Sequence, residues 1–451
     1  MVNTMDRLEE FIREHKITEV ECLVPDMSGI ARGKIIPAEK LLRILRERGM
    51  PLPESVFIQT VTGDYPDGEL IGSSMGDVYM IPDENTVRLV PWYKESTAQI
   101  ICDAYYADDT PVPFSSRYIL KKILAEYEKR GWNAVVAPEL EFYLVNVNTD
   151  PDIPLMPPVG RSGRRESGRQ AYGIDAVNEF DPIFEDVYDY CEAQNIDIDT
   201  LSHEAGAAQI EVNFNHGYPL EVADQAFLFK RTAREVAMRH GVYATFMAQP
   251  MQMQPGSAMH IHQSIVDSKT GKNLFSTDDG ADTQFFRNFV GGLQRYLPNS
   301  LPMFASNVNS YRRFGHKETD SPINVEWGLD NRTAGLRVPV SKPENRRIEN
   351  RLPGADGNPY LVIAATLACG LMGILEEIEP SEQIKGSAYK KGHALSTHMF
   401  DALKKFKANK QLQEMLGEQF IRTLVGIKET EFKAYNAVIS SWERENLLLN
   451  V

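Results

Sequence analysis

The sequence predicts an α+β protein in which a mainly β N-terminal region precedes a larger region of alternating strands and helices. Residues 20–107 consist of short apolar runs broken by Gly, Pro and Asp, a texture typical of short strands. After Ser116, apolar residues recur at helical spacing up to Gly131, and strands and helices alternate from there onwards. The length of 451 residues, with 42% hydrophobic and 25% charged residues, suits a globular protein of two or three domains.

The N-terminal region divides into a helix and a β domain. A helix is predicted over residues 1–16, because Leu8, Phe11 and Ile12 share one helical face. The short apolar runs that follow predict a mainly β domain over residues 17–110.

The remainder of the chain is predicted to form the larger domain, residues 111–451. The polar, proline-rich stretch DDTPVPF at residues 108–114 marks the boundary. Farther along, the apolar run at residues 360–375 is too short to cross a bilayer and predicts a buried helix. The last stretch of the chain, about 60 residues, is rich in charged residues, and the periodicity of its apolar positions predicts that it is helical.

Charge and cysteine usage exclude several classes of function. The formal net charge is −15, and so acidic a surface repels phosphates and anionic lipids, so we expect no nucleic-acid or membrane partner. The four cysteines contain no Cys-x-x-Cys pair, which argues against a disulfide framework or a thiolate metal site. Neither a P-loop nor a Gly-x-Gly-x-x-Gly fingerprint is present. The charged N-terminus lacks signal-peptide features, so we expect a cytoplasmic protein.

Four separated segments each place polar residues on one face of a predicted strand. Alternate side chains of a strand point to opposite faces, so in VAPELEFYLV (136–145) two glutamates lie opposite Leu140 and Phe142. The four polar faces are Glu139 and Glu141; Gln209, Glu211 and Asn213 in AQIEVNF (208–214); His260, His262 and Ser264 in MHIHQSI (259–265); and Arg347, Glu349 and Arg351 in RIENRL (347–352).

The residue types on these faces predict a chemical site. A single polar face is most often a solvated one, but these faces carry Glu, His and Arg, and the flanking elements are strongly apolar. Carboxylates rarely occupy a buried sheet unless they are paired or bind a metal. Glutamates with an imidazole and no thiolate suit Mg²⁺ or Mn²⁺, while arginines suit phosphates and carboxylates. The combination indicates phosphoryl transfer without a P-loop.

A polar segment at residues 151–170, containing RSGRRESGRQ, interrupts the alternating pattern. A loop this rich in Gly, Ser and Arg can bind an anion, but the same composition is more often found in a mobile surface loop. The sequence leaves both interpretations open.

These segments belong to a set of motifs that resembles the type I glutamine synthetases over nearly the whole chain. The motifs are DMSGIARGK (26–34), PELEF (138–142), HE (203–204) followed by Glu211, GSAMHIH (256–262), NRTAGLRVP (331–339), RIENR (347–351) and NPY (358–360). Their number and order argue strongly against a chance match. The segments YRRF, WGLDNRT and RIENRLPGAD are similar to those of the family branch that forms γ-glutamylpolyamines and γ-glutamylputrescine.

The resemblance implies a β-grasp fold for residues 17–110. For residues 111–451 it implies a glutamine-synthetase-type catalytic α/β domain with a curved antiparallel sheet. It also implies a homo-oligomer, a dodecamer of two stacked hexameric rings with active sites between neighbouring subunits. The implied reaction is an ATP-dependent ligation, in which glutamate is activated as γ-glutamyl phosphate and an amine then attacks. The substrates would be glutamate, ATP and a polyamine or another small primary amine.

The family's functional residues carry over to matching positions. Two Mg²⁺ or Mn²⁺ ions per active site are implied, one held by Glu141, Glu204 and Glu211 and the other by Glu139, His260 and Glu349. The glutamate-binding residues would be Gly256, Arg313 and Arg351. The ATP-binding residues would be His262, Ser264, Arg332, Arg337 and Arg347, and the catalytic residues Arg332, Asp320 and Glu349.

The amine site departs from the pattern of family members that use ammonia. The family's FDGSS segment is replaced by FIQTVTGD (57–64), and its flap glutamate is either absent or replaced by Asp320. Ammonium needs a compact acidic pocket that binds it and takes its proton, so both changes predict a larger amine. Asp64, Asp67 and Glu69 are candidates to bind its second ammonium group, although an exposed acidic turn is the commoner interpretation of each.

Two other functions fit the family resemblance. The first alternative is a true glutamine synthetase that uses ammonia, and the second is a non-catalytic ring protein of the family. A non-catalytic member would be expected to have lost metal ligands, yet all six positions are filled. The identity of the amine does not follow from the sequence.

Overall fold

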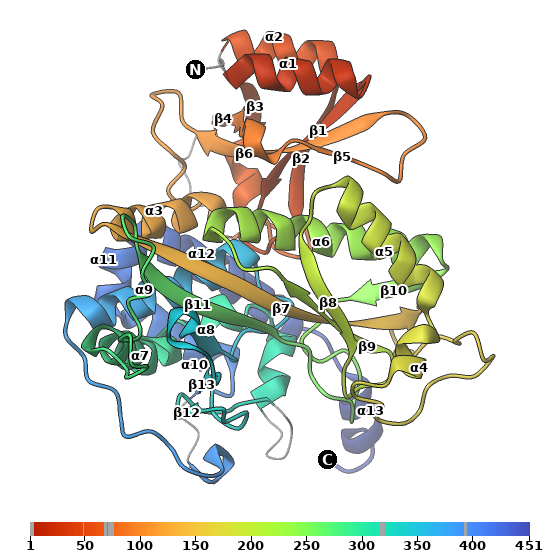
Figure 1. Cartoon of the computed structure of the whole chain (residues 1–451). Coiled ribbons are helices and arrows are strands. Elements are labelled where there is room, and N and C mark those ends of the chain that lie inside the picture. The colour runs from red at the N-terminus through yellow and green to blue at the C-terminus, as the bar shows by residue number, and fades with distance from the viewer. Residues whose placement is uncertain (1–3, 48, 67–69, 71–75, 315–320, 392–394) are drawn as a thin grey trace.

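The computed structural model describes residues 4–47, 49–66, 70, 76–314, 321–391 and 395–451. Two sheets organise this part of the chain, a six-stranded sheet near the N-terminus and an eight-stranded sheet in the rest (Figure 1). The mixture of helix and sheet is the class that the sequence predicts. Among the described residues, no helix has the length and apolar character needed to cross a membrane.

The N-terminal sheet has the strand order β2-β1-β6-β4-β3, with β5 paired to β6. Its strands are β1 (Glu19–Pro25), β2 (Ala31–Pro37), β3 (Met50–Pro53), β4 (Asp77–Pro82), β5 (Arg88–Leu89) and β6 (Thr97–Tyr105). β1 and β6 pair in parallel, and the other described pairs are antiparallel. Helices α1 (Thr4–Glu14) and α2 (Ala38–Glu47) contact each other at the top of Figure 1.

Helix α2 is an element that the short apolar runs did not predict. Leu41, Leu42, Ile44 and Leu45 recur at helical spacing, and Leu41 is fully buried. The expectation of a mainly β region was therefore incomplete, because a short amphipathic helix between strands looks like one more apolar run.

The larger sheet has the strand order β12-β13-β14-β11-β7-β9-β8, with β10 paired to β7. Its strands are β7 (Trp132–Asn146), β8 (Ile198–His203), β9 (Gln209–Phe214), β10 (Val242–Thr245), β11 (Met259–Asp267), β12 (Trp327–Leu329), β13 (Leu336–Val338) and β14 (Ile348–Asn350). The described pairs are antiparallel except β12 with β13. The four segments with a polar face are therefore neighbours in space, as β14, β11, β7 and β9.

Helices cover one face of the larger sheet. α3 and α6 pack against β7, and α9 packs against α3, α6 and α7. Figure 1 shows α3 and α6 between this sheet and the N-terminal part. The helices are α3 (Ser116–Glu128), α4 (Ile174–Asn178), α5 (Asp181–Ala193), α6 (Pro219–Arg239), α7 (Gln284–Tyr296), α8 (Leu301–Phe304), α9 (Pro359–Leu375), α10 (Met399–Ala408), α11 (Lys410–Leu416), α12 (Glu418–Asn436) and α13 (Ser441–Leu447).

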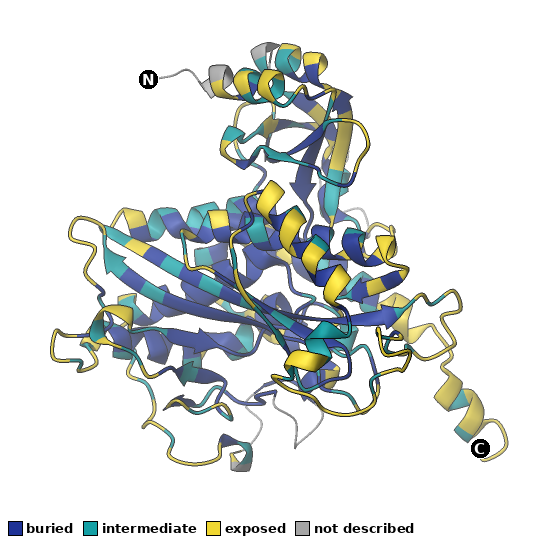
Figure 2. Cartoon of the chain, turned by 45° about the vertical axis from the view of Figure 1, so that its right-hand side comes forward, coloured by how far each residue is buried: buried dark blue, intermediate teal, exposed yellow. Residues whose placement is uncertain are grey.

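Helix α9 lies in the core, as its apolar run predicts. The Asn358 side chain accepts the backbone N–H of Tyr360 and so caps the helix, and residues 359–373 are buried. At its far end α9 approaches α7 so closely that a Cβ on Gly373 would lie 2.4 Å from the Cα of Gly292. Figure 2 shows the buried residues concentrated in the sheet and the helices behind it.

A buried arginine joins the two parts of the chain. Arg117 on α3 is 1% exposed and forms ion pairs with Asp83 (2.7 Å), Asp103 (2.8 Å) and Asp224 (2.9 Å). The first two aspartates belong to the N-terminal part and the third lies on α6. Through these ion pairs, Arg117 ties the N-terminal sheet to the helices behind the larger sheet.

Candidate active site

Strand pairing brings the predicted metal ligands together. Glu139 on β7 lies directly opposite His260 on β11. Glu141, two residues further along β7, lies opposite Glu211 on β9. Directly opposite residues point to the same side of a sheet, so these four side chains share the face that the helices do not cover.

Two groups of side chains are compact enough to hold a metal ion. One consists of Glu139, His260 and Glu349 and the other of Glu141, Glu211 and His260, and in each the potential ligand atoms lie within 4.8 Å of one another. His260 Nδ1 lies 3.3 Å from Glu139 Oε2 and 3.5 Å from Glu349 Oε1. Carboxylate oxygens with one imidazole form a ligand set that fits Mg²⁺ or Mn²⁺.

Glu204, the sixth predicted ligand, lies beside the second group. It directly follows β8 and lines the same cavity as Glu141 and Glu211. Its charge contributes to the raised pKa values of both those carboxyls. The sequence predicted Glu204 as the third ligand beside Glu141 and Glu211, whereas in the compact group the third residue is His260.

Burial and mutual repulsion shift the acidity of the cluster. Burial, together with the charge of Glu204, raises the pKa of Glu141 to about 8. Burial and the neighbouring carboxylates raise the pKa of Glu211 to about 9. Burial also opposes ionisation of Glu349, but the charges of Arg351 and the nearby histidines outweigh it and lower its pKa to about 2. A divalent cation would relieve the repulsion, so the electrostatics of the cluster favour cation binding.

The cluster opens into a cavity of about 560 Å³ that arginines also line. Glu349 is fully buried, and it pairs with Arg337 at 2.9 Å and with Arg351. Arg332 and Arg337 line the cavity, as do the predicted glutamate-binding residues Gly256, Arg313 and Arg351. Positive groups therefore surround the carboxylate cluster on the side where an anionic substrate would enter.

Gly256 and Arg313 fit together closely at one wall of this cavity. Arg313 is 2% exposed, and its guanidinium donates to the Leu352 carbonyl at 3.0 Å. Its Nε has no hydrogen-bond partner among the described residues. A Cβ on Gly256 would lie 2.6 Å from Arg313 Cγ, so any side chain at this position would displace the arginine.

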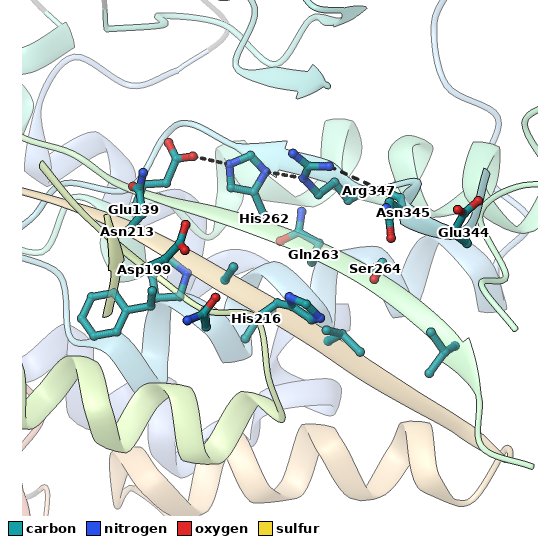
Figure 3. Close-up of a pocket in the computed structure, with 17 residues that line it drawn as sticks. Glu139, Asp199, Asn213, His216, His262, Gln263, Ser264, Glu344, Asn345 and Arg347 are labelled. Atoms are coloured by element: carbon teal, nitrogen blue, oxygen red, sulfur yellow. Dashed lines mark hydrogen bonds and ion pairs between the residues drawn. The ribbon is translucent and has the colours of Figure 1, made fainter. Parts of the chain in front are cut away.

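A second cavity of about 460 Å³ meets the first at Glu139 (Figure 3). The predicted ATP-binding residues His262, Ser264 and Arg347 line it. His262 Nε2 lies 2.8 Å from Glu139 Oε1, and Arg347 Nε donates to His262 Nδ1 at 3.3 Å. Because Nδ1 accepts, the imidazole carries its proton on Nε2 and donates to the carboxylate. Figure 3 shows these three side chains in one row.

Of the predicted amine-binding residues, only Asp64 belongs to the part of the chain that the structure describes. Asp64 is exposed and accepts a hydrogen bond from Thr62 at 2.8 Å, and it lines neither cavity. Asp67, Glu69 and Asp320 lie outside the described residues.

Gln209 is a site residue that the sequence analysis placed on a polar face but did not assign. Its side chain is buried, and Nε2 donates to Glu141 Oε2 at 3.1 Å and to the Gly256 carbonyl at 3.0 Å. It therefore links a predicted metal ligand to the predicted glutamate-binding loop. Tyr172 and Asn345, which line the first and second cavities respectively, were also not predicted. No spacing pattern distinguishes such residues from ordinary loop or strand positions.

Comparison with known proteins identifies the family. A family model described as the catalytic domain of glutamine synthetase matches residues 113–447. The chain belongs to the glutamine synthetase family. The resemblance that the motifs indicate is thereby confirmed, and the larger part of this family member has the glutamine synthetase catalytic fold.

Two relatives of this family member are similar over nearly the whole chain. Gamma-glutamylputrescine synthetase PuuA of Escherichia coli (strain K12) is 33% identical over 440 residues, which cover 96% of this chain and 92% of the relative. Glutamate–isopropylamine ligase of a Pseudomonas species is 32% identical over 451 residues, which cover 97% and 96%. A solved structure described as apo GmaS without ligand has a TM-score of 0.84 at 26% identity, with both chains fully covered.

Proposed function

We propose that this protein is an ATP-dependent ligase that joins the γ-carboxylate of glutamate to a polyamine or another primary amine through γ-glutamyl phosphate. The observation that carries the proposal is the meeting of two cavities at Glu139. Phosphoryl transfer from ATP to a carboxylate needs both substrates side by side, with positive charge around the transferred group. The names of both relatives, which refer to putrescine and isopropylamine, support an organic amine as the nucleophile.

Two divalent cations, Mg²⁺ or Mn²⁺, would bind the carboxylate cluster. The proposed ligands are Glu141, Glu204 and Glu211 for one ion and Glu139, His260 and Glu349 for the other. The donor set and the raised pKa values of Glu141 and Glu211 support the assignment. When bound, the cations neutralise phosphate charge and polarise the phosphoryl group.

The chain's own residues would bind and orient glutamate in the larger cavity. Arg313 and Arg351 are proposed to hold its α-carboxylate beside Gly256, and the unpartnered Nε of Arg313 supports this role. Glutamate held here by its α-carboxylate would present its γ-carboxylate to the carboxylate cluster. The arginine pair then fixes which of the two carboxylates is phosphorylated.

The nucleotide would occupy the smaller cavity, with His262, Ser264 and Arg347 as its binding residues. Arg332 and Arg337 line the larger cavity and are proposed to hold the transferred phosphoryl group. Arg332 is proposed as a catalytic residue, because a fixed cation there stabilises charge that develops in the transition state.

The amine must lose a proton before it attacks the acyl phosphate, because primary amines are protonated at neutral pH. Asp320 and the acids Asp64, Asp67 and Glu69 are proposed to accept this proton or to bind a distal ammonium group. Because Asp64 lines neither cavity of its own chain, its role requires a neighbouring subunit.

The arrangement of the whole protein is part of the proposal. We assign a helix to residues 1–16, a β-grasp domain to residues 17–110 and the catalytic domain to residues 111–451, with a curved catalytic sheet that is antiparallel except for the pair β12 and β13. A dodecamer of two hexameric rings would bring Asp64 of one subunit toward the cavity of the next. We propose a cytoplasmic location, where glutamate, ATP and amines are available.

The proposal is tested by phosphate release from ATP with glutamate and Mg²⁺ and a series of amines: ammonium, putrescine, spermidine, isopropylamine and ethanolamine. We expect kcat/KM for at least one organic amine to exceed that for ammonium by at least roughly 100-fold, about 2.7 kcal/mol of transition-state binding. If ammonium is the best substrate, the protein is a glutamine synthetase. If ATP binds but no amine supports turnover, the protein is a non-catalytic member of the family.

A further inference from the structure

The polar segment at residues 151–170 is anchored beside the larger cavity through Glu166. The Glu166 side chain is 12% exposed, and its Oε2 accepts the backbone N–H of Ala208 at 2.7 Å. The same oxygen lies 2.9 Å from Nε2 of His203, whose ring is fully buried. On its other side, His203 Nδ1 lies 2.6 Å from the backbone carbonyl of Glu204. Because a carbonyl only accepts, Nδ1 is the donor there.

The two groups that Glu166 holds lie at the ends of the turn from β8 to β9, which carries site residues at both ends. Glu204 begins the turn and Gln209 follows it. Within the turn, the backbone N–H of Gly206 donates to Gln209 Oε1 at 2.9 Å. A Cβ on Gly206 would lie 1.9 Å from Tyr143 Oη. The turn therefore has little freedom of position once its ends are held.

The two residues that directly follow the anchored segment form part of the cavity wall. The backbone N–H of Tyr172 donates to the carbonyl of His203 at 2.8 Å, and Ala171 and Tyr172 line the larger cavity. The arginines of the segment do not line that cavity; Arg165, for example, donates to the Pro157 carbonyl. Of the two interpretations that the sequence left open, anion binding is thus not supported at this cavity. A mobile surface loop is not supported either, because the partly buried carboxylate of Glu166 fastens the segment.

We propose that Glu166 is a positioning residue for the cation and glutamate side of the active site. It acts through His203 and Ala208, which it holds at a fixed distance from each other. This sets the positions of Glu204, a proposed cation ligand, and of Gln209, which orients Glu141 and the Gly256 loop. Partners of metal ligands commonly change metal affinity when they are removed. The inference rests on the proposed function, because it takes the carboxylate cluster as the cation site.

The contacts of Glu166 define two informative substitutions and a control. Both contacts use Oε2, and the buried Oε1 has no hydrogen-bond partner among the described residues. Glu166→Gln can therefore keep the Ala208 contact through its amide oxygen but lacks the charge that faces His203, whereas Glu166→Ala removes both contacts. Glu179→Ala is the matched control: its carboxylate accepts the backbone N–H of Ser162 at 3.0 Å in the same loop, and it lines neither cavity.

The experiment is a Mn²⁺ titration of the full-length, metal-free protein by electron paramagnetic resonance, without glutamate or amine, alongside calorimetric titration with ADP. We expect Glu166→Ala to weaken one of two Mn²⁺ sites by about tenfold or more and to raise the KM for glutamate. ADP affinity should remain within about twofold, because the nucleotide cavity does not contact the turn. Glu179→Ala should match the wild type, and Glu166→Gln, which keeps the Ala208 contact, should bind Mn²⁺ with an affinity between those of the wild type and Glu166→Ala.

The inference is overturned if Glu166→Ala melts as the wild type does and binds both Mn²⁺ ions with wild-type affinity. If Glu166→Ala fails to fold, Glu166→Gln decides: a folded Gln variant that binds both Mn²⁺ ions with wild-type affinity shows that the contact between Glu166 and His203 does not position the cation side. The titration requires no amine. If the wild-type protein binds Mn²⁺ but joins no amine to glutamate, the proposed function is refuted and the role of Glu166 remains.

Discussion

Addition of Mg²⁺ to the metal-free protein at pH 7 should release protons from the carboxylate cluster. Burial and neighbouring charges raise the pKa of Glu141 to about 8 and that of Glu211 to about 9. At pH 7 each carboxyl is then about 90% protonated or more, and a cation must displace these protons to be bound by carboxylates. We expect the release of about one to two protons per active site, and a Mg²⁺ affinity that rises roughly 50-fold between pH 7 and pH 8.

The assay is calorimetric titration with Mg²⁺ in buffers that differ in their enthalpy of ionisation, because the slope of binding heat against that enthalpy counts the protons released. Glu211→Gln should lower the count by about one, since its amide carries no proton to release. A binding heat that is the same in all buffers would refute the reasoning, as would equal affinities at pH 7 and pH 8.

Three further predictions concern stability and turnover. In the metal-free protein, Glu141 and Glu211 keep protons that the unfolded chain loses near pH 4.5. This stabilisation is complete below about pH 4.5 and is lost as the pH rises through 8 and 9. The melting temperature in EDTA should therefore fall between pH 6 and pH 9, and a rise over this range would contradict the prediction. Arg332→Ala should lower kcat by on the order of 10²-fold without unfolding the protein, and near-normal turnover would exclude the assigned role. Arg117→Ala should lower the free energy of unfolding by about 3–5 kcal/mol, because it leaves the buried carboxylate of Asp224 without its ion-pair partner; chemical denaturation measures this, and a loss below about 1 kcal/mol would show that the cluster does not join the two parts.

The polar faces of the strands were predictable because the side-chain period of a strand is fixed at two residues. That rule alone places Glu139 with Glu141 and His260 with His262. It does not say that β14, β11, β7 and β9 are neighbours, since pairing between distant segments depends on the topology of the whole sheet. The motif resemblance supplied that part of the prediction.

The positioning residues were beyond the reach of sequence patterns. Gln209 and Glu166 act through hydrogen bonds to side-chain and backbone groups that only the folded chain brings near them. Helix α2 was missed because short amphipathic helices and short strands have similar apolar content. The amine site stays a prediction, because Asp64 lies outside both cavities of its own chain.

The most direct test of the central claim is a competition between two nucleophiles in one reaction. The protein is incubated with ATP, Mg²⁺, glutamate and equimolar putrescine and ¹⁵N-ammonium, and the products are quantified by mass spectrometry. We predict γ-glutamylputrescine in roughly 100-fold excess over labelled glutamine, with one ADP and one phosphate formed for each amide. Labelled glutamine as the main product, both with putrescine and with each other amine of the series in its place, would contradict the claim that an organic amine is the substrate.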